Sequence, residues 1–122
     1  MNDTTYSYIG LQSLKEDTFG DTSILRMIIE LFIEDIDVYV NTLSSELQNH
    51  NWKALFQQTH KIKPNITMFG IHTLVAPILE LEKSCKNEEN LEEVEPLVNI
   101  ISTSLICAKK ELQTELNSMP NE

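Results

Sequence analysis

The sequence is poor in the residues that break helices or build disulfide and metal frameworks. Its 122 residues include 3 Gly, 4 Pro and 2 Cys. Scarce Gly and Pro favour long helices over many short strands. Cys85 and Cys107 lie far apart and in no C-x-x-C arrangement, so neither a zinc site nor a redox motif is indicated. The chain is long enough for one domain with a real core and too short for two, so we expect a single domain over residues 1–122.

The sequence also lacks a basic surplus and any long apolar run. It carries 19 acidic and 9 basic residues, for a net charge of -10, whereas nucleic acids and anionic membranes attract basic surfaces. No apolar segment approaches the roughly 18 residues of a membrane span, and the polar start at Met1 has no signal-peptide pattern. We therefore expect a cytoplasmic protein that binds other proteins, with no nucleic acid and no membrane among its partners. The initiating Met1 and the polar tail at 117–122 favour a stand-alone chain over a segment of a hybrid kinase, and a monomer is expected.

Four long segments repeat their apolar residues with the period of a helix. They cover residues 22–49, 51–70, 72–86 and 91–117. The turns between them are short, which implies antiparallel neighbours, so the sequence predicts an all-α fold: an antiparallel up-down four-helix bundle. Residues 8–19 add a short N-terminal helix or arm, and Asp21 is available to cap the next helix. Residues 1–7 and 118–122 are expected to be loose.

The first long segment has more apolar surface than one core face requires. Ile24, Met27, Leu31 and Val38 lie on a different side from the main apolar stripe. Apolar surface of this extent is usually buried by another segment or by a partner. The simpler interpretation is that the N-terminal arm folds onto these residues, and the functional alternative is that a partner's helix does.

The segment from Asn51 to Gly70 carries a histidine that its helical pattern leaves outside the core. The apolar stripe of this segment consists of Trp52, Leu55, Phe56, Thr59, Ile62, Ile66 and Phe69. His60 falls off this stripe. Its neighbours at three, four and seven residues are Gln57, Lys63, Pro64 and Thr67. We therefore predict that the imidazole is reachable by solvent or by another protein.

The charge around His60 departs from that of the whole chain. No Asp or Glu occurs between Leu47 and Leu79, whereas three lysines do: Lys53, Lys61 and Lys63. An exposed imidazole beside lysines suits a phosphoryl group, because an unprotonated ring nitrogen is a nucleophile and the lysines balance charge on the oxygens. Lys61 and Lys63 are about 200° apart around the helix. Lys63, on the side of the histidine, is therefore the predicted phosphoryl contact, and Lys61 is a solvated charge that adds to the long-range field.

The order of these residues resembles a known signature. His60-Lys61-Ile62-Lys63 followed by Gly70 is similar to the motif of histidine-containing phosphotransfer (HPt) domains, in which a His, a Lys three residues on and a Gly ten residues on share one helix of a four-helix bundle. Gly20-Asp21, the segment 30–35 and Leu81-Glu82 also resemble the family pattern, which covers Tyr8 to Leu112. The family usually has Gly where this chain has Pro64, and a proline there predicts a local kink just past the histidine.

The resemblance implies a function. His60 would accept a phosphoryl group from the aspartyl phosphate of one receiver domain and pass it to another, between a hybrid histidine kinase and a response regulator. Such a protein is a phosphotransfer intermediate without autokinase activity; it needs no cofactor, because Mg²⁺ is expected on the partner receiver domain. The expected docking residues surround His60 and continue onto the preceding helix: Phe56, Gln57, Lys61, Pro64, Thr67, Met27 and Leu31.

Other interpretations stay open from the residues alone. An HPt-shaped adaptor could bind a receiver without phosphotransfer if Pro64 disrupts the chemistry, and an unrelated bundle could carry His60 incidentally. A di-metal bundle site is not indicated, because no histidine has a Glu three residues before it. The glutamates from Glu88 to Glu95 are most simply a solvated helix start, and a docking role is the alternative.

Overall fold

The computed structural model describes residues 5–119. Within them it contains five α-helices and two short 3-10 turns. These are α1 (Gln12–Asp17), α2 (Thr22–Gln48), α3 (Trp52–Met68), η1 (His72–Leu74), α4 (Val75–Asn87), η2 (Leu91–Glu93) and α5 (Val94–Ser118). The fold is all-α, as predicted, and the four long helices are joined by short turns.

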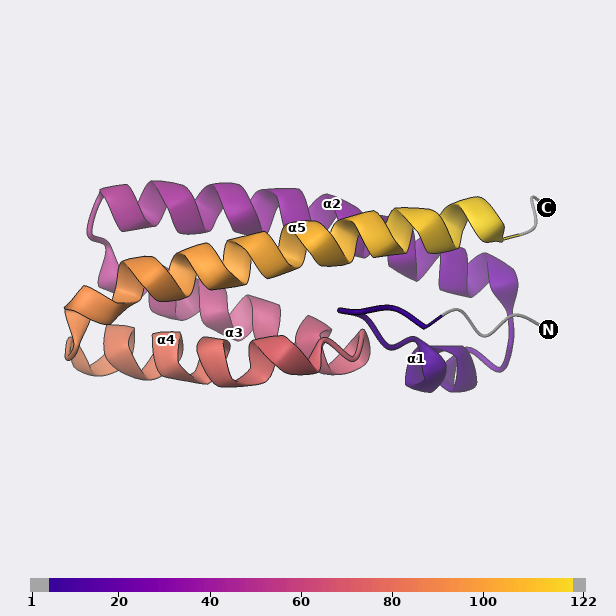
Figure 1. Cartoon of the computed structure of the whole chain (residues 1–122), viewed down its shortest axis with the longest axis horizontal. Helices are drawn as coiled ribbons and strands as arrows, with labels where there is room; N and C mark the ends of the chain where they lie inside the picture. Colours follow the sequence, from indigo (N-terminus) through magenta and orange to yellow (C-terminus); the bar gives the residue numbers. More distant parts are fainter. Residues whose placement is uncertain (1–4, 120–122) are drawn as a thin grey trace.

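The bundle has two long helices and two shorter ones. α2 and α5 have 27 and 25 residues and lie against each other, whereas α3 and α4 have 17 and 13. The N-terminal end of α2 and the C-terminal end of α5 therefore extend past the ends of α3 and α4, and α1 lies beneath this overhang (Figure 1). The predicted up-down bundle with a small N-terminal addition is confirmed.

The core forms because each long helix buries one apolar stripe. Fully buried side chains come from all four, and they include Ile29, Ile36, Leu43, Leu55, Ile62, Ile78, Leu81, Ile101 and Leu105. Near the far end of α3, the rings of Phe32 and Phe69 stack with centroids 4.1 Å apart. Burial of a large apolar side chain contributes about 1.5–3 kcal/mol, so these stripes supply most of what fixes the helices side by side.

Polar caps start two of the helices, and the one at Asp21 was predicted from the sequence. The Asp21 carboxylate accepts the N–H of Ile24 at 3.1 Å, and the Asn51 side chain accepts the N–H of Ala54 at 3.1 Å. The predicted helices 72–86 and 91–117 each begin as a 3-10 turn instead. Both α-helices then have a proline in their first turn, Pro77 in α4 and Pro96 in α5. The N–H groups of a first turn have no acceptor within the helix, so a proline there costs no helical hydrogen bond.

The N-terminal arm is fixed by α5 and by the end of α3. One oxygen of the Glu111 carboxylate accepts the backbone N–H groups of Tyr8 and Ile9 at 2.9 and 3.0 Å, and the other accepts that of Ser7 at 2.9 Å. Further along, the N–H of Gly10 donates to the carbonyl of Phe69 at 2.8 Å. Ser7, expected to be loose, is therefore bound; the ends at 1–4 and 120–122 lie outside the described residues.

This arm does not cover the second apolar face of α2, so that prediction was wrong. The four residues of that face stay open: Ile24, Met27, Leu31 and Val38 are 43%, 54%, 54% and 59% exposed. The arm follows Glu111 because a carboxylate offers strong acceptors for backbone N–H groups, an attraction that the apolar pattern of α2 cannot reveal.

Gly70 explains how the arm can lie so close to α3. Its φ is +63°, and a Cβ added to it would lie 2.6 Å from the carbonyl oxygen of Gly10. Any other residue would meet both a strained backbone and a steric clash. Across residues 5–119, no helix combines the length and apolarity that a membrane span requires.

Candidate functional site

His60 lies on the exposed side of α3, about midway along the helix. Leu55, Ile62 and Ile66 turn to the core and are nearly or fully buried. The His60 side chain, in contrast, is 55% exposed. The same helical periodicity that buries the apolar stripe thus places the imidazole in solvent, as the sequence predicted.

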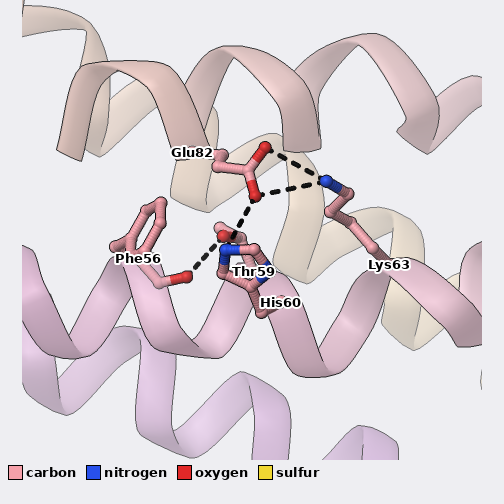
Figure 2. A network of polar contacts seen from close by, with 5 residues as sticks. All are labelled: Phe56, Thr59, His60, Lys63 and Glu82. Atoms are coloured by element: carbon pink, nitrogen blue, oxygen red, sulfur yellow. Dashed lines mark hydrogen bonds and ion pairs between the residues drawn. The ribbon is translucent and has the colours of Figure 1, made fainter. Parts of the chain in front are cut away.

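The imidazole has an aromatic neighbour on its own helix. The rings of Phe56 and His60 meet edge to face, with centroids 4.7 Å apart. Phe56 is half-buried, and its carbonyl accepts the hydroxyl of buried Thr59 at 2.6 Å. The Phe56 ring thus restricts the imidazole from one side, and α4 lies on another side (Figure 2).

A carboxylate from α4 contacts both the histidine and the predicted phosphoryl-binding lysine. Oε2 of Glu82 lies 3.2 Å from Nε2 of His60, and the Nζ of Lys63 lies 3.1 and 3.2 Å from the two Glu82 oxygens. The Glu82 side chain is only 17% exposed. Figure 2 shows this carboxylate pointing down from α4 between the two α3 side chains.

The surroundings of His60 are therefore not free of acid, and that expectation was wrong. It rested on a window of sequence, and Glu82 reaches the site from another helix. The register of α3 against α4 is what brings Glu82 to His60, and no local pattern encodes it. Leu81-Glu82 was noted in the sequence only as a resemblance to the family pattern.

The two lysines near His60 lie in different environments. Lys63 is partly buried on the α4 side, whereas the Lys61 side chain is exposed. The carbonyl of Lys61 accepts the Tyr39 hydroxyl at 3.3 Å, and the Asn65 amide donates to the same hydroxyl at 2.9 Å. Burial, with a smaller effect of the Asp35 charge, raises the pKa of Tyr39, so the hydroxyl stays protonated and ties α2 to α3 beside the site.

The imidazole opens onto a basic hollow between α3 and α4. Its volume is about 420 Å³. The residues that line it are Phe56, His60, Lys63, Glu82, Lys83, Lys86 and Asn87. Lys83 and Lys86, both on α4, were not among the predicted site residues. Three lysines around one histidine in a chain of net charge -10 make this hollow a local exception in charge.

A second, apolar hollow adjoins the first at Lys63. It is lined by Lys63, Ile66, Thr67, Val75, Ile78 and Leu79. Val75 and Leu79 are 45% and 48% exposed. The sequence analysis placed apolar docking residues on the first long segment and did not consider this hollow on α4, because a helix pattern does not say which flank of the neighbouring helix the histidine faces.

The remaining predicted docking residues keep to the surface. Gln57, Pro64 and Thr67 are exposed on α3, and Met27 and Leu31 are exposed on α2. α3 runs unbroken from Trp52 to Met68 through Pro64. Within residues 5–119, no group of three or more His, Cys, Asp or Glu side chains is arranged to hold a metal ion.

Comparison with known proteins agrees with this architecture. A family model described as the Hpt domain matches residues 27–122. The crystal structure of histidine-containing phosphotransfer protein B (HptB) from Pseudomonas aeruginosa PAO1 superimposes with a TM-score of 0.83, at 19% identity, over 95% of this chain and 100% of that one. A search of curated proteins found no match. Because the Hpt model covers most of the sequence, including the helix that carries His60, the chain belongs to the Hpt domain family.

Proposed function

We propose that this protein is a histidine phosphotransfer intermediate and that His60 is its phosphoacceptor. The observation that carries the proposal is the exposed imidazole of His60, which lines a hollow together with Lys63, Lys83 and Lys86. A neutral imidazole is a nucleophile near neutral pH, and the cations compensate the negative charge of the incoming oxygens. His50 and His72, the other two histidines, lie in a turn and at the start of η1.

The chemistry needs little else from this chain. When Nε2 attacks the phosphorus of an aspartyl phosphate, the N–P bond forms, the P–O bond breaks and its electron pair stays on the departing aspartate. Lys63 is close enough to hold a phosphoryl oxygen once Glu82 has moved. We propose that Mg²⁺ is held by the partner receiver domain, which supplies most of the transition-state stabilisation.

We propose that a receiver domain covers the His60 face together with apolar residues on either side. Met27 and Leu31 on α2 and Val75 and Leu79 on α4 are each about half exposed. Gln57, Lys61, Pro64 and Thr67, which project from α3, would form part of the polar rim. Transient signalling complexes are small, with an apolar centre and a polar rim.

In this proposal the chain acts as a cytoplasmic monomer between the receiver domains of a hybrid histidine kinase and of a response regulator. The test is phosphoryl transfer from a radiolabelled phosphorylated receiver domain to wild type, to H60Q and to the matched controls H50Q and H72Q. Label is expected on wild type and both controls, absent from H60Q, lost in acid and retained in base.

The outcomes separate the possible functions. Binding of the receiver without transfer of label would overturn the relay and favour an adaptor that only titrates the receiver. Absence of both binding and transfer, across receiver domains encoded beside this chain, would mean that His60 has no role in phosphotransfer and that the bundle has an unrelated function. Label on H60Q would move the acceptor to another residue.

A further inference from the structure

The Glu82 carboxylate lies where a phosphoryl group on His60 would have to lie. Its Oε2 is 3.2 Å from Nε2 of His60, and both of its oxygens are within 3.2 Å of the Nζ of Lys63 (Figure 2). A phosphoryl group bonded to Nε2 would present its oxygens to the same lysine. Two anions cannot share this place, because like charges at contact distance repel strongly in a partly buried site.

We infer that Glu82 is an internal competitor of the phosphoryl group and that it changes partner, from Lys63 to Lys86, when His60 is phosphorylated. The inference rests on the proposed function and gives a positioning role to Glu82, which lies outside the segment from His60 to Gly70. In the resting protein Glu82 neutralises Lys63, and in the phosphorylated protein Lys63 is released to the phosphoryl oxygens.

Lys86 is suited to receive the carboxylate. It follows Glu82 by four residues on α4, so the two side chains lie on the same face, with the acid on the N-terminal side, the favourable order for such a pair. Both line the hollow that His60 opens onto. Lys83 also lines it but is the residue next to Glu82, about 100° around the helix, and adjacent side chains do not face each other.

The exchange also fixes which ring nitrogen reacts. A carboxylate only accepts hydrogen bonds, so in the resting contact Nε2 of a neutral His60 carries the proton. The ring is 55% exposed, so water can move this proton to Nδ1 as Glu82 leaves. The freed Nε2 lone pair then attacks phosphorus while Nδ1 keeps its proton, the aspartyl P–O bond breaks, and the aspartate leaves with the electron pair.

This competition lowers the equilibrium level of phosphohistidine, because the resting state has a charge partner that phosphorylation must displace. The comparison of E82Q with wild type measures it, since glutamine keeps the shape and removes the charge. With a receiver domain that phosphorylates wild type, the equilibrium constant for phosphohistidine formation is expected to rise about three- to tenfold in E82Q, the range typical of a partly buried ion pair.

Lys86 is tested against a lysine that lines the same hollow. K86Q and K83Q change the net charge equally, so any general weakening of the basic field is common to both. K86Q is expected to lower the same equilibrium constant about twofold more than K83Q does. In the E82Q background K86Q and K83Q should lower the equilibrium constant equally, because no carboxylate is left for Lys86 to bind.

A second readout follows the resting contact directly. ¹⁵N NMR of the unphosphorylated imidazole reports the tautomer, and the Nε2–H form is expected to lose population in E82Q but not in K83Q. An unchanged phosphohistidine equilibrium in E82Q, or equal effects of K86Q and K83Q, would overturn the inference while leaving the relay intact. Failure of wild type to accept label from any receiver domain would instead remove the proposed function.

Discussion

Two glutamates in this bundle each collect several hydrogen-bond donors, and they do so for different ends. Glu111 on α5 accepts three backbone N–H groups of the arm. Glu82 on α4 contacts two side chains, His60 and Lys63. Backbone N–H groups need an acceptor, so the arrangement around Glu111 is structural. Side chains on an open hollow can exchange partners, so the second arrangement suits a site that must accept and release an anion.

The largest effect is expected where the arm meets α3, at Gly70. G70A should lower the free energy of unfolding by about 2–4 kcal/mol, because the added Cβ would clash with the Gly10 carbonyl in a positive-φ conformation. Gly20 is the matched control, since its φ is +75° but no atom lies within 4 Å of an added Cβ. G20A should cost about 1 kcal/mol. Equal losses in urea denaturation would mean that the arm contributes nothing at this point.

The next effect compares the two glutamates directly. E111Q should cost about 1–3 kcal/mol, because the amide replaces one acceptor oxygen with a donor that faces backbone N–H groups. E82Q should cost less than about 1 kcal/mol, as expected for an exchangeable ion pair near the surface. Denaturation of both variants under one condition measures the difference. A larger loss in E82Q would reverse the roles assigned to the two carboxylates.

A kinetic comparison separates the two lysines that flank His60. K63Q should slow phosphoryl transfer about tenfold, because it removes the cation nearest the phosphoryl oxygens. K61Q should slow it less than about twofold, since Lys61 is exposed on the other side of the helix. Single-turnover transfer from a phosphorylated receiver gives both rates. Equal slowing would mean that only the overall basic field matters.

The last effect appears only at alkaline pH and concerns the buried side of α4, three residues after Glu82. Burial raises the pKa of the Cys85 thiol to about 11 from its ordinary 9.0. The folded state thus holds this proton when the unfolded state has lost it, and the resulting stability is complete below pH 9.0 and disappears as the pH rises through about 11. Urea denaturation across this range should give a steeper decline for wild type than for C85A. Parallel declines would assign the alkaline sensitivity to other groups.

The sequence was sufficient for the fold because each long helix carries its own periodic apolar stripe. The apolar stripe of α3 and the cap at Asp21 lie where the pattern indicated. The exposure of His60 follows from the same periodicity. These are local properties, which side-chain spacing along one helix determines.

What the sequence missed depends on contacts between distant segments. Glu82 meets His60 through the register of α4 on α3, and the arm meets Glu111 through backbone N–H groups, which every non-proline residue possesses. Neither contact has a sequence period. Gln58 is a smaller case, since it is 5% exposed although the apolar stripe of its helix did not include it.

The proline inside α3 changes how the backbone around the imidazole is held. Pro64 has no N–H, so the main-chain oxygen of His60 lacks the donor that normally binds it from four residues ahead. α3 therefore continues past the histidine with one main-chain hydrogen bond fewer than a helix without proline. Packing of α3 against α2 and α4 has to hold the backbone at that point.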